Sequence, residues 1–119
     1  MILSDIEAKL QELDPRVCYG VVDNTVKNAP VWDCIVFGRS NIKYPANKIS
    51  ASDYFDVLVI RENYIPDGFD TEIIQALTSL DGVRLAGDTA TFDYVQKPNT
   101  DTVIEMLTLS FVRSRKCSV

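Results

Sequence analysis

One strongly apolar stretch, residues 53–63 (DYFDVLVIREN), constrains the fold more than any other part of the chain. The alternation of a β-strand places apolar side chains on both of its faces, with Phe55, Val57 and Val59 on one and Leu58 and Ile60 on the other. A strand with two apolar faces has to be covered on each side. We therefore expect residues 53–63 to form a central strand of a sheet.

Segments on either side of this stretch predict the rest of the sheet and two helices. Residues 16–22, 31–38 and 102–113 are rich in β-branched and aromatic residues, which is typical of strands. Residues 83–85 and 90–96 indicate either one more strand or a broken hairpin. Apolar residues at helical spacing predict a helix in two places, formed by Leu3, Ile6, Leu10 and Leu13 and by Ile73, Ile74, Leu77 and Leu80.

The predicted order of elements is α-β-β-β-α-β-β, which favours an α+β domain. We expect a mostly antiparallel sheet of about four to five strands, with the N-terminal helix and the second helix packed on one face. Residues 39–52 (RSNIKYPANKISAS) are polar and lack periodicity, so they predict a long loop, and such loops are often interaction surfaces. Residues 1–119 contain no internal repeat and no linker, so they are expected to form a single domain.

Composition argues against several classes of function. The chain carries 12 Lys and Arg against 17 Asp and Glu, whereas domains that bind nucleic acid through its phosphates are usually basic. It has no histidine, and its three cysteines form no CxxC pair, so no zinc site is expected. Cys18 and Cys34 lie in apolar segments and are predicted to be small core residues. No apolar run approaches the ~18 residues that span a membrane.

The carboxylates also predict structural roles. Asp53 and Asp56 are three residues apart on the predicted central strand, so their side chains point to opposite faces and cannot share a site. Asp88 and Asp93 flank a predicted turn, and all four are expected to be solvated. Glycine-rich phosphate loops and a GxSxG nucleophile motif are absent from the sequence. We therefore expect no catalytic residues, no metal and no cofactor, and a protein that is not an enzyme.

Charge is unevenly distributed along the chain. Two segments hold three basic residues each and no acidic residue: Arg39, Lys43 and Lys48 within 39–52, and Arg113, Arg115 and Lys116 near the C-terminus. The rest of the chain has six basic against 17 acidic residues, a net charge of −11. In one interpretation the basic segments simply stay solvated. In the other, the basic loop or tail of one copy meets the acidic surface of the next, a head-to-tail contact that closes into a ring if the rotation fits.

The last predicted strand and several aromatic residues bear on the same question. A long strand such as 102–113 is an aggregation hazard at a sheet edge, so it is either paired with another copy or buried inside the sheet. Trp32, Tyr44, Tyr64 and Tyr94 lie at strand ends or in loops, where they either anchor an interface or cap the core. The candidate interface residues are Arg39, Lys43, Tyr44, Lys48, Tyr64, Arg113, Arg115 and Lys116.

Two segments of the sequence resemble a known family. Residues 53–66 (DYFDVLVIRENYIP) and 92–105 (FDYVQKPNTDTVIE) are similar to small neck proteins of tailed bacteriophages that infect Gram-positive hosts. In length and element order the whole chain resembles the tail terminator, or tail completion, family. Members of that family have an N-terminal helix, a strand meander, a second helix and a long final strand.

The resemblance implies a structural virion protein of the tail and neck, assembled in the host cytoplasm. It implies a hexameric ring that caps the tail tube, ends the growth of the tube and joins the tail to the head connector. The implied partners are other copies of the chain, the tail tube protein and the stopper protein of the connector, with no membrane. DNA would pass through the lumen without specific binding, and an acidic body suits that passage because it repels phosphates.

Two other interpretations stay open. Related neck proteins of the stopper or adaptor type share this size and element order. Alternatively, a cellular domain of ferredoxin-like topology would use its sheet face to bind a small ligand or to regulate a partner, since a fold alone does not fix function. A concave apolar pocket with a few convergent polar groups would favour the second of these interpretations.

Overall fold

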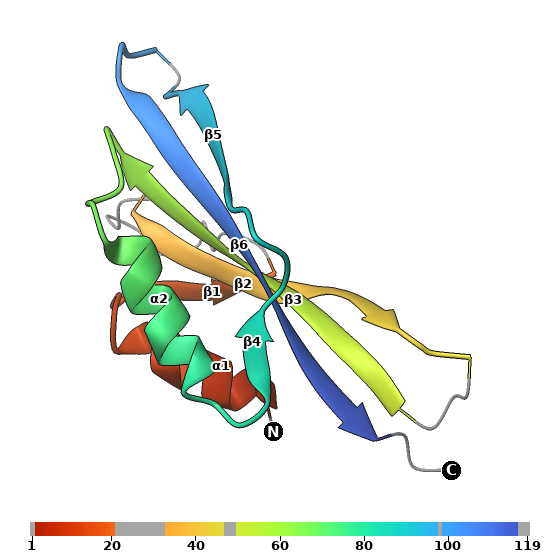
Figure 1. The fold of residues 1–119 in the computed structure, drawn as a ribbon. Helices are drawn as coiled ribbons and strands as arrows, with labels where there is room; N and C mark the ends of the chain where they lie inside the picture. Colours follow the sequence, from red (N-terminus) through yellow and green to blue (C-terminus); the bar gives the residue numbers. More distant parts are fainter. Residues whose placement is uncertain (1, 21–32, 47–49, 98, 117–119) are drawn as a thin grey trace.

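The computed structural model describes residues 2–20, 33–46, 50–97 and 99–116 of the chain. Within these residues the chain forms two helices and six strands (Figure 1). In chain order they are α1 (Ile2–Gln11), β1 (Val17–Tyr19), β2 (Cys34–Lys43), β3 (Ser50–Glu62), α2 (Phe69–Thr78), β4 (Val83–Leu85), β5 (Thr91–Gln96) and β6 (Val103–Lys116). The α+β class expected from the sequence is confirmed.

All six strands belong to one sheet. The strands lie in the order β1-β2-β3-β6, and two short strands share the outer side of β6, with β5 along residues 103–108 and β4 along residues 111–113. β1 runs parallel to β2, whereas the other described pairings are antiparallel. β3 lies between β2 and β6, which confirms that residues 53–63 belong to a central strand.

Both helices pack on the same face of the sheet, as predicted (Figure 1). Ile6 of α1 and Ile73 of α2 are fully buried against the strands, at positions that the helical spacing predicted. The rings of Phe55 and Phe111 stack in this core with their centroids 5.4 Å apart, which joins β3 to β6. The main hydrophobic core therefore lies between the two helices and the middle of the sheet.

A smaller apolar cluster lies on the face of the sheet that points away from the helices. Its buried members are Cys18, Cys34, Val36, Ile60 and Ile104. Cys18 and Cys34 are thus core residues, as predicted. Burial, followed by the neighbouring Cys18, raises the pKa of the Cys34 thiol to about 11. A thiol that stays protonated at neutral pH is a poor nucleophile, so Cys34 has a structural role.

The polar segment 39–52 is not a long loop, and that prediction was wrong. β2 continues to Lys43 and β3 begins at Ser50. Polar residues form a strand here because their backbone pairs with β3, as it does at Ile42 opposite Asp53. This end of the sheet extends beyond the helices (Figure 1), so its side chains meet water and need not be apolar.

Residues 83–96 form two separate strands, each paired with β6, so the sheet has six strands instead of the expected four to five. β6 is consequently an interior strand along most of its length. We expected residues 102–113 either to pair with another copy or to lie inside the sheet, and the structure shows the second arrangement. The strand predicted at 16–22 shortens to β1, while residues 21, 22, 31 and 32 of the predicted strands lie outside the described residues.

Candidate assembly surfaces

The sheet extends beyond the helices at two opposite ends (Figure 1). The β5 end contains β5 and the first half of β6, and the β2 end contains the last part of β2, the start of β3 and the last part of β6. Most of the large apolar side chains that are exposed gather at these ends: Ile42 and Tyr44 at the β2 end, and Tyr64, Phe92, Tyr94, Val95 and Val103 at the β5 end. Clusters of exposed apolar groups are typical of contact surfaces.

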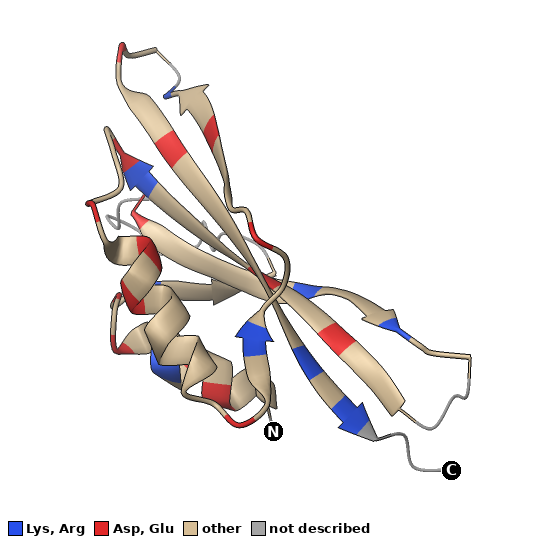
Figure 2. Cartoon of the chain, viewed as in Figure 1, with Lys and Arg blue, Asp and Glu red and all other residues tan. Residues whose placement is uncertain are grey.

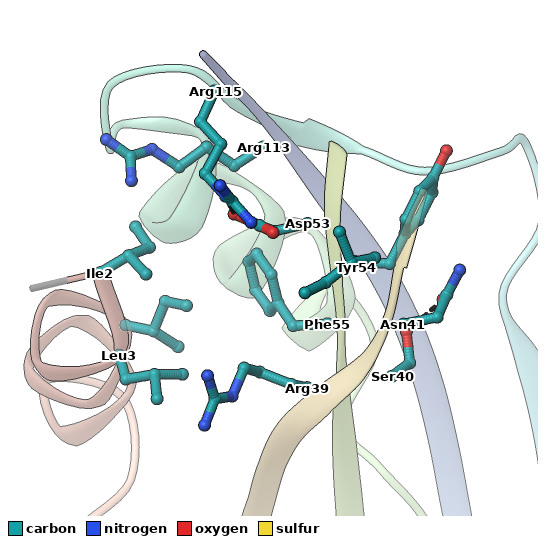
Figure 3. A pocket seen from close by; sticks show the side chains of 12 residues that line it. Ile2, Leu3, Arg39, Ser40, Asn41, Asp53, Tyr54, Phe55, Arg113 and Arg115 are labelled. Atoms are coloured by element: carbon teal, nitrogen blue, oxygen red, sulfur yellow. Dashed lines mark hydrogen bonds and ion pairs between the residues drawn. The ribbon is translucent and has the colours of Figure 1, made fainter. Parts of the chain in front are cut away.

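A pocket of about 470 Å³ opens at the β2 end, between the first turn of α1 and the sheet (Figure 3). We call it the basic pocket, and its principal lining residues are Ile2, Leu3, Arg39, Ile42, Asp53, Phe55, Arg113 and Arg115. Figure 3 shows the side chains of Ile2 and Leu3 on one side and Phe55 on the other, with the three arginines around them. The pocket is therefore apolar inside and basic at its margin.

The charged groups around the basic pocket have a positive net charge. Three guanidinium groups line it with a single carboxylate. Arg115 Nε donates to Asp53 Oδ2 at 2.7 Å, which forms an ion pair. Arg39 Nε donates to the hydroxyl of Tyr19 at 3.3 Å, and Arg113 Nε donates at 3.2 Å to a backbone carbonyl in the turn before β4. These last two acceptors are neutral oxygens, so the pocket keeps an excess of positive charge.

The β5 end carries the opposite charge (Figure 2). On the helix side it forms a hollow of about 430 Å³, whose lining includes Tyr64, Asp67, Asp70, Phe92, Tyr94 and Glu105. We call this the acidic aromatic surface. Two basic residues lie near this end, and both form ion pairs: Arg61 with Asp14, and Lys97 with Glu62 at 2.7 Å. Acidic charge therefore dominates the acidic aromatic surface.

Glu105 organises the acidic aromatic surface. Its Oε1 accepts the backbone N–H of Ile65 at 2.7 Å and so fixes the segment that leaves β3. A hydrogen bond to Glu105, helped by desolvation, raises the pKa of the Tyr94 hydroxyl above its usual 10.0. The side chains of Tyr64 and Tyr94 are nevertheless 71% and 61% exposed. Two largely exposed aromatic side chains thus lie beside a carboxylate whose position is fixed by its hydrogen bonds.

Five of the predicted interface residues lie at the β2 end, and one of them, Tyr44, directly follows β2 and is exposed. Arg39, Arg113 and Arg115 line the basic pocket although they lie far apart in sequence. Lys43 is the last residue of β2 and belongs to the same end. The antiparallel pairing of β2 with β3, and of β3 with β6, brings the two basic segments of the sequence side by side.

The other predicted interface residues do not join them in one site. Tyr64 lies at the opposite end of the sheet, in the acidic aromatic surface. Lys116 ends β6, and its side chain lies outside the described part of the structure. Lys48 and the aromatic Trp32 are also outside the described residues.

Sequence reasoning missed Ile2, Phe92 and Glu105. Leu3 was assigned to the core stripe of the first helix, yet it lines the basic pocket together with Ile2. A signal for Phe92 existed, because Phe92 and Tyr94 are two residues apart and a strand places them on one face. Glu105 gave no local signal, since its role depends on the register that sets Tyr94 opposite Glu105.

The carboxylates considered for catalysis have structural or solvated positions. Asp53 belongs to the ion pair in the basic pocket, and Asp56, on the opposite face, accepts a hydrogen bond from the Ser110 hydroxyl at 2.8 Å. Asp88 and Asp93 are exposed. Across the described part of the chain, no three potential metal ligands are grouped closely enough to hold an ion, and neither described helix combines the length and apolarity needed to cross a membrane.

No family model matches this sequence, and neither does any curated protein. The resemblance to tail terminators therefore stays a prediction, and function has to be inferred from the two charged ends of the sheet.

Proposed function

We propose that this protein is a structural neck protein of a tailed bacteriophage, of the tail terminator type, that assembles with copies of itself into a ring. The observation that carries this proposal is the presence of two unlike surfaces, the basic pocket and the acidic aromatic surface, at opposite ends of one sheet (Figure 2). Each surface combines charged groups with exposed apolar groups. Aromatic residues and arginine are enriched in protein interfaces, and both occur here.

Two unlike surfaces favour a head-to-tail contact over a two-fold one. In a two-fold dimer centred on one of these two surfaces, that surface meets its own copy, which would oppose like charges here. In a head-to-tail contact the acidic aromatic surface of one protomer meets the basic pocket of the next. Repetition of that contact gives a closed ring when the rotation between protomers closes. The tail terminator family implies six copies.

The proposed ring would act by position and not by catalysis, and it needs no cofactor. Seated on the end of the tail tube, it blocks the surface to which the next tube subunit would add. Its other side then meets the stopper protein of the head connector in the virion neck, after assembly in the host cytoplasm. The net charge of −5 suits a lumen through which DNA slides, because like charge prevents tight binding of phosphates.

A tube-polymerisation assay tests this proposal. Tube protein of the same phage is polymerised with increasing amounts of this protein, and tube lengths are measured by negative-stain electron microscopy. We expect shorter tubes with a ring at one end, and no shortening by an Arg39→Glu variant that folds normally. Tube lengths that are unchanged at equimolar protein would refute a terminator. Binding to the connector without binding to the tube would instead identify a stopper or adaptor protein.

The basic pocket favours a second candidate function, the binding of a small amphipathic anion, although the observed order of elements is not the β-α-β-β-α-β order of a ferredoxin-like domain. The apolar walls of the pocket, its arginines and its volume of about 470 Å³ are typical of small-molecule sites. Calorimetric titration with decanoate tests this candidate. Saturable binding that is lost in an Arg39→Ala variant would support it, and the absence of heat in the wild type would exclude decanoate-like ligands.

A further inference from the structure

Two strand edges are unpaired within the part of the chain that the structure describes, and they lie on opposite sides of the sheet. β1 covers β2 only along Ile35, Val36 and Phe37, which leaves the outer edge of residues 38–43 open. β5 pairs with β6 on one side only, and its own six residues offer an open edge of equal length. Open edges expose backbone donors and acceptors and are templates for another strand.

We propose that β5 of one copy pairs with the open edge of residues 38–43 of the next copy, so that one sheet continues from protomer to protomer. This inference rests on the proposed ring and specifies the contact that builds it. The occupant of each open edge is thus a second copy of this chain.

Strand directions fit this pairing. β2 is antiparallel to β3, β3 to β6, and β6 to β5, so β5 and β2 run in opposite directions within one protomer. β5 lies level with the start of β2, whereas residues 38–43 lie nearer the other end of the sheet, so the ring axis has to be inclined to the strands, as in a closed β-barrel, where neighbouring strands keep their alternating directions. The β5 strand of a neighbour would therefore meet β2 as an antiparallel strand, the more favourable of the two arrangements.

The backbone of β5 directs hydrogen-bonding groups outward at three positions. The N–H of Lys97 donates to the carbonyl of Thr102 at 2.8 Å, so this pair is hydrogen-bonded across the β5–β6 ladder. Hydrogen-bonded and non-hydrogen-bonded pairs alternate in an antiparallel ladder. The N–H groups of Phe92, Tyr94 and Gln96 therefore point away from β6.

The same alternation applies to β2 as far as Arg39, after which a bulge between Arg39 and Asn41 shifts the register of the strand. The N–H of Ile35 donates to the carbonyl of Arg16 at 3.0 Å, and the carbonyl of Phe37 accepts the N–H of Gly20 at 2.8 Å. Both residues thus direct their backbone groups away from β3. Arg39 follows two residues later and continues this alternation, so its backbone groups point to the open edge.

Side chains on the helix side of the two edges are complementary. On β5, Phe92 lies opposite Leu107 of the main core, and Tyr94 lies opposite Glu105. On β2, Arg39 and Ile42 line the basic pocket. An incoming β5 would therefore bring two aromatic rings to an arginine-rimmed apolar pocket, where cation–π and apolar contacts form, with Glu105 one strand behind them on β6.

The opposite face of the sheet is complementary as well. Asp93 lies opposite Met106, which packs against the smaller apolar cluster, so the Asp93 carboxylate is on the face away from the helices. Lys43 lies opposite Ser52, an even-numbered β3 residue like Ile60 of the same cluster, and therefore shares that face. A carboxylate of one copy would thus meet an ammonium group of the next. Such pairs select the partner more than they add affinity.

Hydrogen exchange of the wild-type protein tests this inference independently of any variant. Exchange rates of single amides are compared between the dilute protomer and the ring. We expect the N–H groups of Phe92, Tyr94 and Gln96 to exchange at least about tenfold more slowly in the ring, because they become hydrogen-bonded. Equal rates at these three positions in protomer and ring would overturn the inference.

A pair of variants at one position provides the second measurement, by size-exclusion chromatography with light scattering. Phe92→Pro removes an outward N–H, a change that edge strands tolerate, whereas Phe92→Val loses the same ring but keeps the N–H. We expect Phe92→Pro to elute as a protomer and Phe92→Val to retain part of the ring. Rings of Phe92→Pro as abundant as those of Phe92→Val would overturn the inference. If Phe92→Pro does not fold, the exchange rates of the wild type decide.

A failure of the β5–β2 pairing can be distinguished from a failure of the proposed function. A wild type that forms a ring without protecting these amides overturns the pairing of β5 with β2 and leaves the proposed function intact. A wild type that forms no ring, alone or on tube ends, overturns both.

Discussion

Arg61 on β3 and Asp14, just after α1, form an ion pair where the helical layer meets the sheet. Asp14 is only 5% exposed, and its second carboxylate oxygen accepts the backbone N–H of Arg16 at 2.8 Å. The guanidinium of Arg61 also donates to the carbonyl of Ile60 at 2.9 Å and lies 5.1 Å from the ring centroid of Phe69, the first residue of α2. Arg61 therefore connects the central strand with the end of one helix and the start of the other.

Asp14→Asn should lower the free energy of unfolding by about 2–3 kcal/mol, because it leaves a partly buried guanidinium without its counter-charge. Urea denaturation measures this change. Glu62→Gln is the matched control, since Glu62 and Lys97 form a much more exposed pair, and its loss should be below about 1 kcal/mol. Equal losses in the two variants would show that the Arg61–Asp14 pair does not hold the layers together.

The raised pKa of Cys34 predicts a dependence of stability on alkaline pH. The unfolded thiol ionises near 9.0, whereas the folded thiol keeps its proton up to about 11. Between these values the folded state binds more protons, so stability is fully present below pH 9 and is lost as the pH rises towards 11. The wild type should therefore lose Tm relative to a Cys34→Ala variant over that range. A constant difference in Tm from pH 8 to 11 would contradict burial of a neutral thiol.

Opposite charges on the two ends of the sheet predict that assembly depends on salt. The Debye length falls from about 10 Å at 0.1 M salt to about 3 Å at 1 M, which screens contacts between exposed charges. The fraction of protein in rings, and the rate of ring formation, should both fall as NaCl is raised over this range. Light scattering during salt dilution measures both quantities. A ring fraction that rises with salt would show that apolar contacts alone select the partner.

A substitution at Tyr64 should reduce ring assembly without changing the stability of the fold. Its side chain is 71% exposed, so Tyr64→Ser should change the free energy of unfolding by no more than about 0.5 kcal/mol while reducing the amount of ring. Phe111→Ala is the contrasting variant, because Phe111 is fully buried and stacks on Phe55, and it should cost about 3–5 kcal/mol. Thermal unfolding and sedimentation equilibrium provide the two readouts. Normal assembly of Tyr64→Ser would remove this residue from the proposed interface.

The centre of the fold could be predicted from the sequence because its signals are local. Val57 and Val59 alternate with Leu58 and Ile60, and the two sets contribute to the two apolar clusters on opposite faces of the sheet. The end of β2 could not be predicted, since residues 39–43 look like a loop until β3 is there to pair with them. Polar residues form a strand at that end because its backbone is hydrogen-bonded, although few of its side chains are buried.

The sequence likewise predicted one part of the candidate surfaces and missed another. The clustering of Arg39 with Arg113 and Arg115 follows from basic segments that the sequence already separates from the acidic body. The apolar wall provided by Ile2 depends on how α1 crosses the sheet, which no local pattern encodes. The role of Glu105 depends on a long-range register between β5 and β6.

Sedimentation velocity of the purified protein, alone and with tube protein, tests most directly whether this chain works by assembling with copies of itself. We predict a discrete species whose mass is a whole multiple, sixfold in the hexamer, of the 13.3 kDa protomer, and which gives way to protomers on dilution. A single 13.3 kDa species at every concentration, with and without tube protein, would contradict the account.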